Sequence, residues 1–362
     1  MTSMKAAVCR EFGKDLTIEE ITLLPPEAGQ VQVKLEACAI CHSDISYIDG
    51  AWGGHLPAVY GHEAAGRISA IGTGVAGYSI GDSVLVTLIK SCGTCPTCAD
   101  GHPVNCETGT DRVAQSPIRL ENGDVAEHGL VTGAFAEEVV VDQSQIAPLP
   151  DDIPMDVASL LSCGVITGLG AVVNTAGVRP GASVVVIGAG GVGLNTIQGA
   201  RIAGASTIIA LDLEDEKLDG ALEFGATHAL NAGADGLVKR VRNLTGGRGA
   251  DYVFITVGAI KVFETAPRYL AARGQMVMVG MPPSGAMASY EPVVLSALSQ
   301  SITGSLMGGT VLKRDIPWLI ELYRQGSLKL DELITNRYPL DRINEAIADT
   351  KTGKSRRNVI VF

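Results

Sequence analysis

The segment Ser183-Val-Val-Val-Ile-Gly188-Ala-Gly190-Gly191-Val-Gly193 joins an apolar run to a glycine-rich turn, and a helical pattern follows it. In this G-x-G-x-x-G spacing, Gly188 permits a tight turn, Gly190 lets the backbone approach a pyrophosphate, and Gly193 lets a helix pack on a strand. A pyrophosphate at the helix N-terminus would meet free N–H groups and the positive end of the helix dipole. The segment therefore predicts a dinucleotide site.

The next apolar run, Thr207–Leu211, ends at Asp212, at the distance where such sites place an acidic residue. A carboxylate there accepts hydrogen bonds from both ribose hydroxyls and repels a 2′-phosphate, so Asp212 favours NAD over NADP. Glu214 and Asp215 add negative charge, and Lys217 is the only cation close by in the sequence. The alternative is an incidental turn followed by a capping Asp; it requires strand, glycines, helix and Asp to coincide by chance.

Around this motif, residues 154–296 alternate between helical and strand patterns, which predicts a parallel, doubly wound sheet of the Rossmann type. The predicted helices are Val157–Val173, Gly191–Ala203, Glu216–Phe224, Leu237–Thr245 and Val262–Leu270. The predicted strands are Ser183–Ile187, Thr207–Leu211, His228–Leu230, Tyr252–Thr256 and Gln275–Val279.

Residues 1–153 have a β-rich pattern, with short apolar runs between turns that contain Gly or Pro. The predicted strands are Lys5–Val8, Gln30–Ala37, Ala64–Ile71, Ser83–Leu88 and Gly133–Val141, and Thr108–Leu130 is predicted as a long loop. We expect the last strand, Asn358–Phe362, to return to this domain. The sequence thus predicts an α/β protein with two domains: residues 1–153 and 297–362, and residues 154–296.

The formal net charge of −11 argues against nucleic acid or an anionic membrane as a partner. The first residues, Met1 to Lys14, lack the apolar run of a signal peptide. Val157–Val178 and Gly181–Ala200 carry no charge over about the length of a membrane span, but their Gly, Asn, Thr and Gln content favours buried α/β segments. We therefore expect a cytoplasmic protein.

Four of the eight cysteines, Cys92, Cys95, Cys98 and Cys106, are spaced C-x-x-C-x-x-C-x7-C. Four thiolates at such spacings can close a tetrahedral site around a zinc ion that stabilises a loop without doing chemistry. An iron–sulfur cluster and a redox thiol pair are the alternatives, and the chain offers no electron-transfer context for the first. Cys9 and Cys38 have no assigned role and are expected to pack in the core.

Cys41, His62 and Cys163 would form an open zinc site, because two thiolates and one imidazole leave a fourth position for water or substrate. Taken singly, Cys163 in an apolar helix is ordinary packing, and His62 between Gly61 and Glu63 is a turn histidine. Spacing alone does not identify the set.

The set is identified by resemblance. Six segments of the chain resemble, in the same order, segments of the medium-chain zinc-dependent alcohol dehydrogenases. They are Cys41-His-Ser-Asp44, Gly61-His62-Glu63-Ala-Ala-Gly66, Cys163-Gly-Val-Ile-Thr-Gly168, the four-cysteine segment, the glycine-rich turn and Gly353-Lys-Ser-Arg-Arg357. The resemblance spans nearly the whole chain. It implies a GroES-like catalytic domain, a Rossmann domain, NAD and two zinc ions per chain.

The family's residue roles carry over by position. Cys41, His62 and Cys163 correspond to the catalytic zinc ligands, Asp44 to the carboxylate that orients the zinc histidine, Glu63 to a carboxylate close to the metal, and Ser43 to the hydroxyl that takes the substrate proton. His42 and Arg357 correspond to pyrophosphate contacts, Thr167 and Val192 to nicotinamide contacts, and Asp212 to the ribose acceptor. Gly188, Gly190, Gly191 and Gly193 form the glycine-rich turn, and Lys217 is also expected to bind the cofactor. Trp52 corresponds to an aromatic wall of the substrate pocket in some members; ordinary packing explains it equally well.

One position departs from the liver- and yeast-type members, which have a proton-relaying histidine where this chain has Ser46. Either the relay runs from Ser43 through the cofactor ribose to water, or another group serves. His55 is a candidate, although a loop histidine on the surface is the simpler interpretation.

The resemblance predicts hydride transfer between a small primary or secondary alcohol, or its carbonyl, and NAD. Two alternatives stay open: oxidation of S-hydroxymethyl thiol adducts on the same scaffold, and a non-enzymatic NAD-binding structural protein. A homodimer or homotetramer joined near Ser299–Ser305 is expected.

Overall fold

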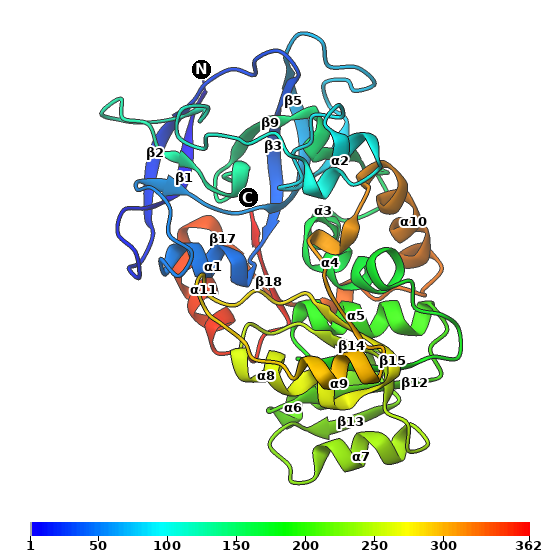
Figure 1. Ribbon diagram of the computed structural model, residues 1–362. Coiled ribbons are helices and arrows are strands. Elements are labelled where there is room, and N and C mark those ends of the chain that lie inside the picture. The colour runs from blue at the N-terminus through cyan, green and yellow to red at the C-terminus, as the bar shows by residue number, and fades with distance from the viewer. Residues whose placement is uncertain (1) are drawn as a thin grey trace. The chain divides into compact units, whose positions relative to one another are not determined.

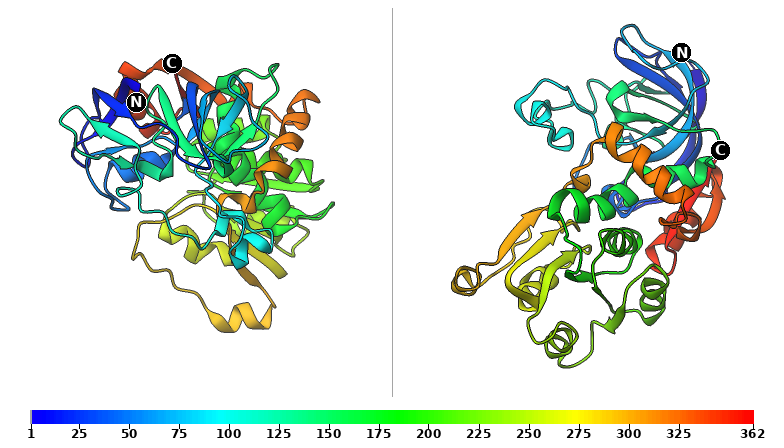
Figure 2. Two further views of the ribbon diagram at one scale, coloured as in Figure 1. Left: turned by 90° about the horizontal axis from the view of Figure 1, so that it is seen from above. Right: turned by 90° about the vertical axis from the view of Figure 1, so that its right-hand side faces the viewer.

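The structure, a computed structural model, describes residues 2–362 and divides into two compact units (Figures 1 and 2). Unit 1 contains the chain up to Cys163 together with Val311–Glu321 and Leu330–Phe362. Unit 2 contains Gly164–Thr310 and Leu322–Lys329. Each unit has hydrophobic core clusters of its own.

Unit 2 is built on a six-stranded parallel sheet with the order β13-β12-β11-β14-β15-β16. Its strands are β11 (Ser183–Ile187), β12 (Thr207–Asp212), β13 (His228–Asn231), β14 (Ala250–Ile255), β15 (Leu270–Met278) and β16 (Ser301–Gly304). Its helices include α4 (Gly164–Gly170), α5 (Gly191–Ile202), α6 (Asp215–Glu223), α7 (Leu237–Leu244), α8 (Ile260–Thr265), the short helix η6 (Ala266–Tyr269) and α9 (Pro292–Ala297). The winding reverses between β11 and β14, so the predicted doubly wound sheet is confirmed, with its ligand crevice expected at the carboxyl end of β11.

The division into units differs from the expected domain boundaries at both ends. Residues 154–163 belong to unit 1, whereas residues 297–310 belong to unit 2. The second difference has a direct cause: β16 pairs in parallel with β15 and extends the sheet by one strand. The sequence pattern ended at β15 because β16 is short and none of its residues is buried.

The single helix predicted over Val157–Val173 is wrong. The segment forms α3 (Met155–Ser159), a short 3-10 turn, a break at Cys163 with φ −147° and ψ −67°, then α4 and the π-helix Ala171–Ala176. Within residues 2–362, no single helix is long and apolar enough to cross a membrane; only the bent pair Met155–Ser162 and Gly164–Ala176 reaches that length and hydropathy.

Unit 1 contains two sheets, with the orders β7-β2-β1-β4-β8 and β10-β6-β5-β3-β18-β17, and β9 pairs with β3. The strands are β1 (Thr2–Cys9), β2 (Thr17–Leu23), β3 (Gln30–Ala39), β4 (Ala58–Val59), β5 (Glu63–Ile71), β6 (Ser83–Val86), β7 (Ile118–Leu120), β8 (Glu127–His128), β9 (Glu138–Asp142), β10 (Ile146–Pro148), β17 (Ile334–Pro339) and β18 (Arg357–Val361). Its helices include α1 (His42–Ile48), α2 (Pro96–Ala99) and α11 (Ile343–Lys351), while α10 spans Leu312–Arg324.

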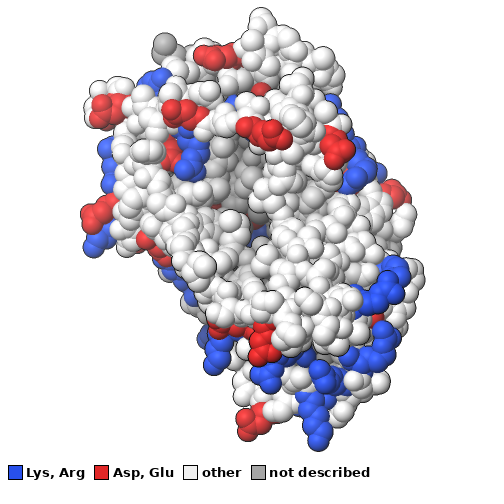
Figure 3. All heavy atoms as spheres, viewed as in Figure 1, with Lys and Arg blue, Asp and Glu red and all other residues white. Residues whose placement is uncertain are grey.

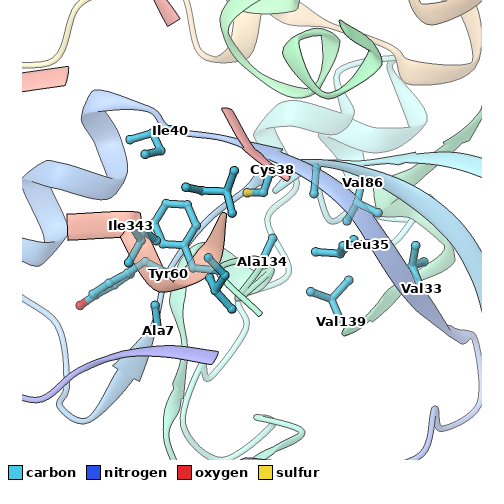
Figure 4. Packing of buried hydrophobic residues seen from close by; sticks show 14 of the residues in the cluster. Ala7, Val33, Leu35, Cys38, Ile40, Tyr60, Val86, Ala134, Val139 and Ile343 are labelled. Carbon is cyan, nitrogen blue, oxygen red and sulfur yellow. The ribbon is translucent and has the colours of Figure 1, made fainter. Parts of the chain in front are cut away.

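The side chains of β3 alternate, so that Val33 and Leu35 enter the core beside Val139 of β9 (Figure 4). The C-terminal strand β18 pairs antiparallel with β3, Val359 opposite Ala39, so the predicted return of the last strand to the first domain is confirmed. The predicted long loop Thr108–Leu130 is wrong in part, because β7 and β8 lie within it and join the smaller sheet.

The glycine-rich turn of unit 2 has the geometry that its three glycines predict. Gly188 has φ +98°, a conformation that favours glycine. A Cβ on Gly193 would lie 1.9 Å from the carbonyl oxygen of Gly188, whereas a Cβ on Gly190 would have no atom within 4 Å. Close packing therefore requires glycine at 193, and the space beside Gly190 is open.

This contrast predicts different costs for two similar substitutions. Gly193→Ala forces the turn backbone to move, so we expect the free energy of unfolding to fall by about 2 kcal/mol or more. Gly190→Ala, the matched control at the helix N-cap, should change it by less than about 1 kcal/mol. Denaturant unfolding of both variants measures the difference, and equal stability of the two would contradict the packing argument.

Candidate active site

Asp44 ties together two segments of unit 1 that are separate in the sequence. It lies in the first turn of α1, fully buried, and accepts the backbone N–H of Cys41 at 3.1 Å and that of Gly61 at 3.0 Å. The same carboxylate lies 2.8 Å from Nδ1 of His62. With the proton on Nδ1, the imidazole is oriented and Nε2 presents a lone pair, as for a metal-bound histidine.

The ligand atoms of Cys41, His62, Glu63 and Cys163 all lie within 4.8 Å of one another, and all four residues are buried. Nε2 of His62 is buried without a hydrogen-bond partner in the described chain, although buried polar atoms are nearly always paired. The Cys163 thiol, by donating a hydrogen bond, lowers the pKa of Cys41 well below its usual range, with His62 acting in the same direction. Two sulfurs and an orphaned imidazole nitrogen fit a zinc ion.

Arg357 lies beside this cluster. Its Nη2 donates to both carboxylate oxygens of Glu63, at 2.5 and 2.7 Å, and its Nη1 donates to the carbonyl of Ile40 at 3.1 Å. The guanidinium is buried, and burial raises the pKa of Glu63 to about 8 despite the opposing charge of Arg357. Sequence reasoning assigned Arg357 to a pyrophosphate and did not find its pairing with Glu63.

The second group of candidate ligands consists of Cys92, Cys95, Cys98 and Cys106, whose sulfurs lie within 4.8 Å of one another around the short helix α2. Backbone N–H groups point at the sulfurs: Cys95 donates to Cys92 at 3.2 Å, and Cys92 donates to Cys106 at 3.3 Å. Such donors stabilise thiolates, and the pKa of Cys92 falls to about 5 because Thr108 and backbone N–H groups hydrogen-bond its sulfur. Within residues 2–362, none of the eight cysteines forms a disulfide. The group fits a closed, structural zinc site.

The first residues of α1 follow Cys41 directly: His42 is exposed, and Ser43 and Ser46 are half-buried. The helix thus carries the predicted proton acceptor next to a candidate zinc ligand. His55 is exposed, and its backbone N–H donates to Glu127.

Trp52 belongs to an aromatic cluster that sequence reasoning missed. Its ring meets Tyr47 edge-on, with centroids 5.3 Å apart, and Tyr47 stacks on Tyr60 at 5.8 Å. The Arg112 guanidinium lies 5.2 Å from the centre of the Tyr47 ring, and its Nε lies 3.0 Å from a carboxylate oxygen of buried Glu127. Because Tyr60 comes just before Gly61 and His62, the cluster adjoins a metal-ligand segment. Only the aromatic character of these residues could have indicated it.

In unit 2, Asp212 lies at the carboxyl end of β12, beside the glycine-rich turn. One carboxylate oxygen accepts the N–H of Ala189 at 2.7 Å, and the other accepts that of Glu214 at 3.1 Å. Thr167 is buried in α4, with its hydroxyl 3.7 Å from the sulfur of Met307. Gly191 and Val192 start α5, and Lys217 is half-buried in α6. The glycine-rich turn and the acidic residue Asp212 are thus brought together, as the motif predicts.

The hydrogen bonds of Asp44 predict a selective effect on metal content. Asp44→Asn weakens the orientation of His62, so we expect zinc affinity at the buried site to fall about 10- to 100-fold. Under mild chelation, zinc per chain should fall from about two to about one, because the four-cysteine site is untouched. Metal analysis measures this, and Cys106→Ser is the matched variant that empties the other site. Unchanged zinc content in Asp44→Asn, with native circular dichroism, would contradict the proposed orientation.

Comparison with known proteins agrees with this geometry. Residues 27–151 match the family described as alcohol dehydrogenase GroES-like domain, and residues 191–325 match the zinc-binding dehydrogenase family. The chain is 37% identical to an NDMA-dependent alcohol dehydrogenase of Amycolatopsis methanolica, over 99% of this chain and 98% of that protein. It is 36% identical to an S-(hydroxymethyl)glutathione dehydrogenase of Komagataella pastoris, over 99% and 97%.

Among solved structures, the benzyl alcohol dehydrogenase of Acinetobacter calcoaceticus superposes with a TM-score of 0.94 at 30% identity, covering 100% of both chains. These matches confirm the predicted combination of a GroES-like domain and a Rossmann sheet. The chain belongs to the medium-chain zinc-dependent alcohol dehydrogenases, a family of oxidoreductases.

Proposed function

We propose that the chain is an NAD-linked, zinc-dependent dehydrogenase that interconverts a small primary or secondary alcohol and its carbonyl compound. The observation that carries this proposal is the buried set of Cys41, His62 and Cys163, in which Nε2 of His62 has no hydrogen-bond partner among residues 2–362. A purely structural NAD-binding protein, the alternative of another class, has no need of such a set.

Cys41, His62 and Cys163 would hold the catalytic zinc, with Glu63 close by. When bound, zinc supplies Lewis acidity that lowers the pKa of a hydroxyl group at the open position. Ser43, two residues from Cys41, would accept the hydroxyl proton and pass it on through hydrogen bonds. Asp44 keeps His62 in one orientation, and Trp52, held by Tyr47, would form an apolar wall of the substrate pocket.

In unit 2, the pyrophosphate of the cofactor would lie over Gly188–Gly193 at the start of α5, where backbone N–H groups are free. Asp212 would accept the ribose hydroxyls and disfavour a 2′-phosphate, and Thr167 and Val192 would contact the nicotinamide. NAD supplies the hydride acceptor. His42 and Arg357 are the basic residues proposed for the pyrophosphate; Arg357 would do so while bonded to Glu63.

We propose the expected domain roles for the two units, catalytic for unit 1 and NAD-binding for unit 2. The four-cysteine group would hold a second, structural zinc. The exposed edge strand β16 fits the expected homodimer or homotetramer contact near Ser299–Ser305. The lack of disulfides within residues 2–362 suits the proposed cytoplasmic location, where thiols stay reduced.

A second candidate, oxidation of S-hydroxymethyl thiol adducts, is favoured by the similarity to S-(hydroxymethyl)glutathione dehydrogenases. The two functions are separated by comparing kcat/KM for plain alcohols with kcat/KM for formaldehyde premixed with a low-molecular-weight thiol. A clear advantage of the adduct would replace the primary proposal by this one.

Removal of one proposed zinc ligand tests the function directly. Cys163→Ala should lose turnover to background with every alcohol, because the open zinc site loses a thiolate. NAD binding, measured by fluorescence titration, should stay within about threefold of wild type. Cys9→Ala, a buried cysteine outside both groups, is the control and should keep its turnover. Retained turnover in Cys163→Ala would refute the ligand assignment.

The proposed cofactor preference depends on Asp212. Asp212→Ser removes the negative charge beside the ribose, so we expect the ratio of kcat/KM with NADP to kcat/KM with NAD to rise at least about tenfold. Glu216→Gln, which removes an exposed charge in the first turn of α6, should leave the ratio near its original value. A wild-type enzyme that prefers NADP would overturn the assignment.

A further inference from the structure

A groove lies in unit 2, lined by residues of α7, α8 and η6, with a volume of about 1100 Å³. Four of its lining residues are basic: Lys239 and Arg242 on α7, Lys261 on α8 and Arg268 on η6. None of its eighteen lining residues is Asp or Glu. In a chain with 39 acidic and 28 basic residues, this local excess of positive charge runs against the overall composition.

The four basic side chains are exposed and uncompensated. Within residues 2–362, none of them takes part in an ion pair or a side-chain hydrogen bond. Figure 3 shows Lys and Arg side chains gathered over the part of unit 2 that carries α7 in Figure 1. Like charges held together without partners repel one another, so an anion in the groove would relieve that repulsion.

Arg242 and Arg268 also line a neighbouring cavity of about 750 Å³, and they therefore stand at the boundary between the two cavities. Glu264 and Glu291 also line that neighbouring cavity, but within residues 2–362 neither forms an ion pair with Arg242 or Arg268. Glu264 lines only the neighbouring cavity, where it accepts the N–H of Ser289 at 3.1 Å. Asp235, which precedes α7, is exposed and outside both linings.

The other end of the groove is apolar. Ile187 and Leu211 lie at the carboxyl ends of β11 and β12, and Leu213 follows β12. A groove with an apolar end and a cationic wall matches a molecule that combines a flat base with several phosphates. The apolar end adjoins the proposed cofactor site, because Ile187 precedes Gly188 and Leu211 and Leu213 flank Asp212. The four basic residues lie outside the glycine-rich turn, on α7, α8 and η6.

We propose that this groove binds a condensed phosphate chain on Lys239, Arg242, Lys261 and Arg268. The chain is either free or carried by a nucleotide whose base occupies the apolar end. In the second case the nucleotide competes with the adenine end of the cofactor, and the groove gives the enzyme a response to nucleoside triphosphates.

Calorimetric titration with inorganic tripolyphosphate and with ATP, at ionic strength matched with sodium chloride, tests the proposal. Arg242→Ala and Arg268→Ala should each weaken binding about tenfold or more, since each removes a charge-assisted contact. Arg240→Ala is the matched control, because Arg240 is an exposed residue of α7 outside the groove; it should change binding by less than about twofold. Zinc content is measured before and after, so that extraction of metal by the ligand is not counted as binding.

The two arms distinguish the source of the phosphate chain. Displacement of ATP but not of tripolyphosphate by NAD assigns the groove to a nucleotide, and equal, NAD-insensitive binding of both assigns it to a free phosphate chain. Absence of saturable binding of either ligand, or equal weakening by Arg240→Ala, would overturn the proposal. Cys163→Ala should bind both ligands like wild type, so the result is independent of the proposed catalytic function.

Discussion

The buried carboxylate of Asp44 is the constraint on which the group of candidate zinc ligands depends. Removed from solvent, it is satisfied by three protein groups, the N–H of Cys41, the N–H of Gly61 and the His62 ring. The pairing of β3 with β5 sets Ala39 opposite Glu63, which brings the ends of two strands to the same place. Asp44 then holds the backbone beyond those ends in place by hydrogen bonds to Cys41 and Gly61. The register of the two strands thereby sets the positions of the candidate ligands Cys41 and His62.

The fold of unit 2 was largely predictable because its physical signals are local. Continuous apolar runs such as Val184–Val186 are buried on both faces of a parallel sheet, and glycines punctuate the turns. The weaker predictions failed where the signal is short or depends on distant partners. Strands β7 and β8 are two or three residues long and exist through pairing with other strands, and β16 is mostly exposed.

The candidate site was predictable only through resemblance, for reasons visible in the structure. Cys163 lies in an apolar stretch whose pattern is helical, yet its backbone leaves the helical region so that its thiol joins Cys41. Arg112 comes from a polar stretch without periodicity, yet it lies over the Tyr47 ring of α1 and pairs with Glu127. Contacts between residues that are far apart in the sequence cannot be predicted from local residue spacing. The pairing of Arg357 with Glu63, for example, joins residues 294 positions apart.

That last pairing has a consequence for biosynthesis. Strand β18 lies between β3 and β17 and carries Arg357, which pairs with Glu63, so the larger sheet of unit 1 stays incomplete until the residues of β18 have been synthesised. The sheet of unit 2 draws all six strands from residues 183–304 and can close while translation continues. The sheet of unit 2 can therefore form first in the nascent chain, and the buried carboxylate of Glu63 gains its counter-charge only after Arg357 has been synthesised.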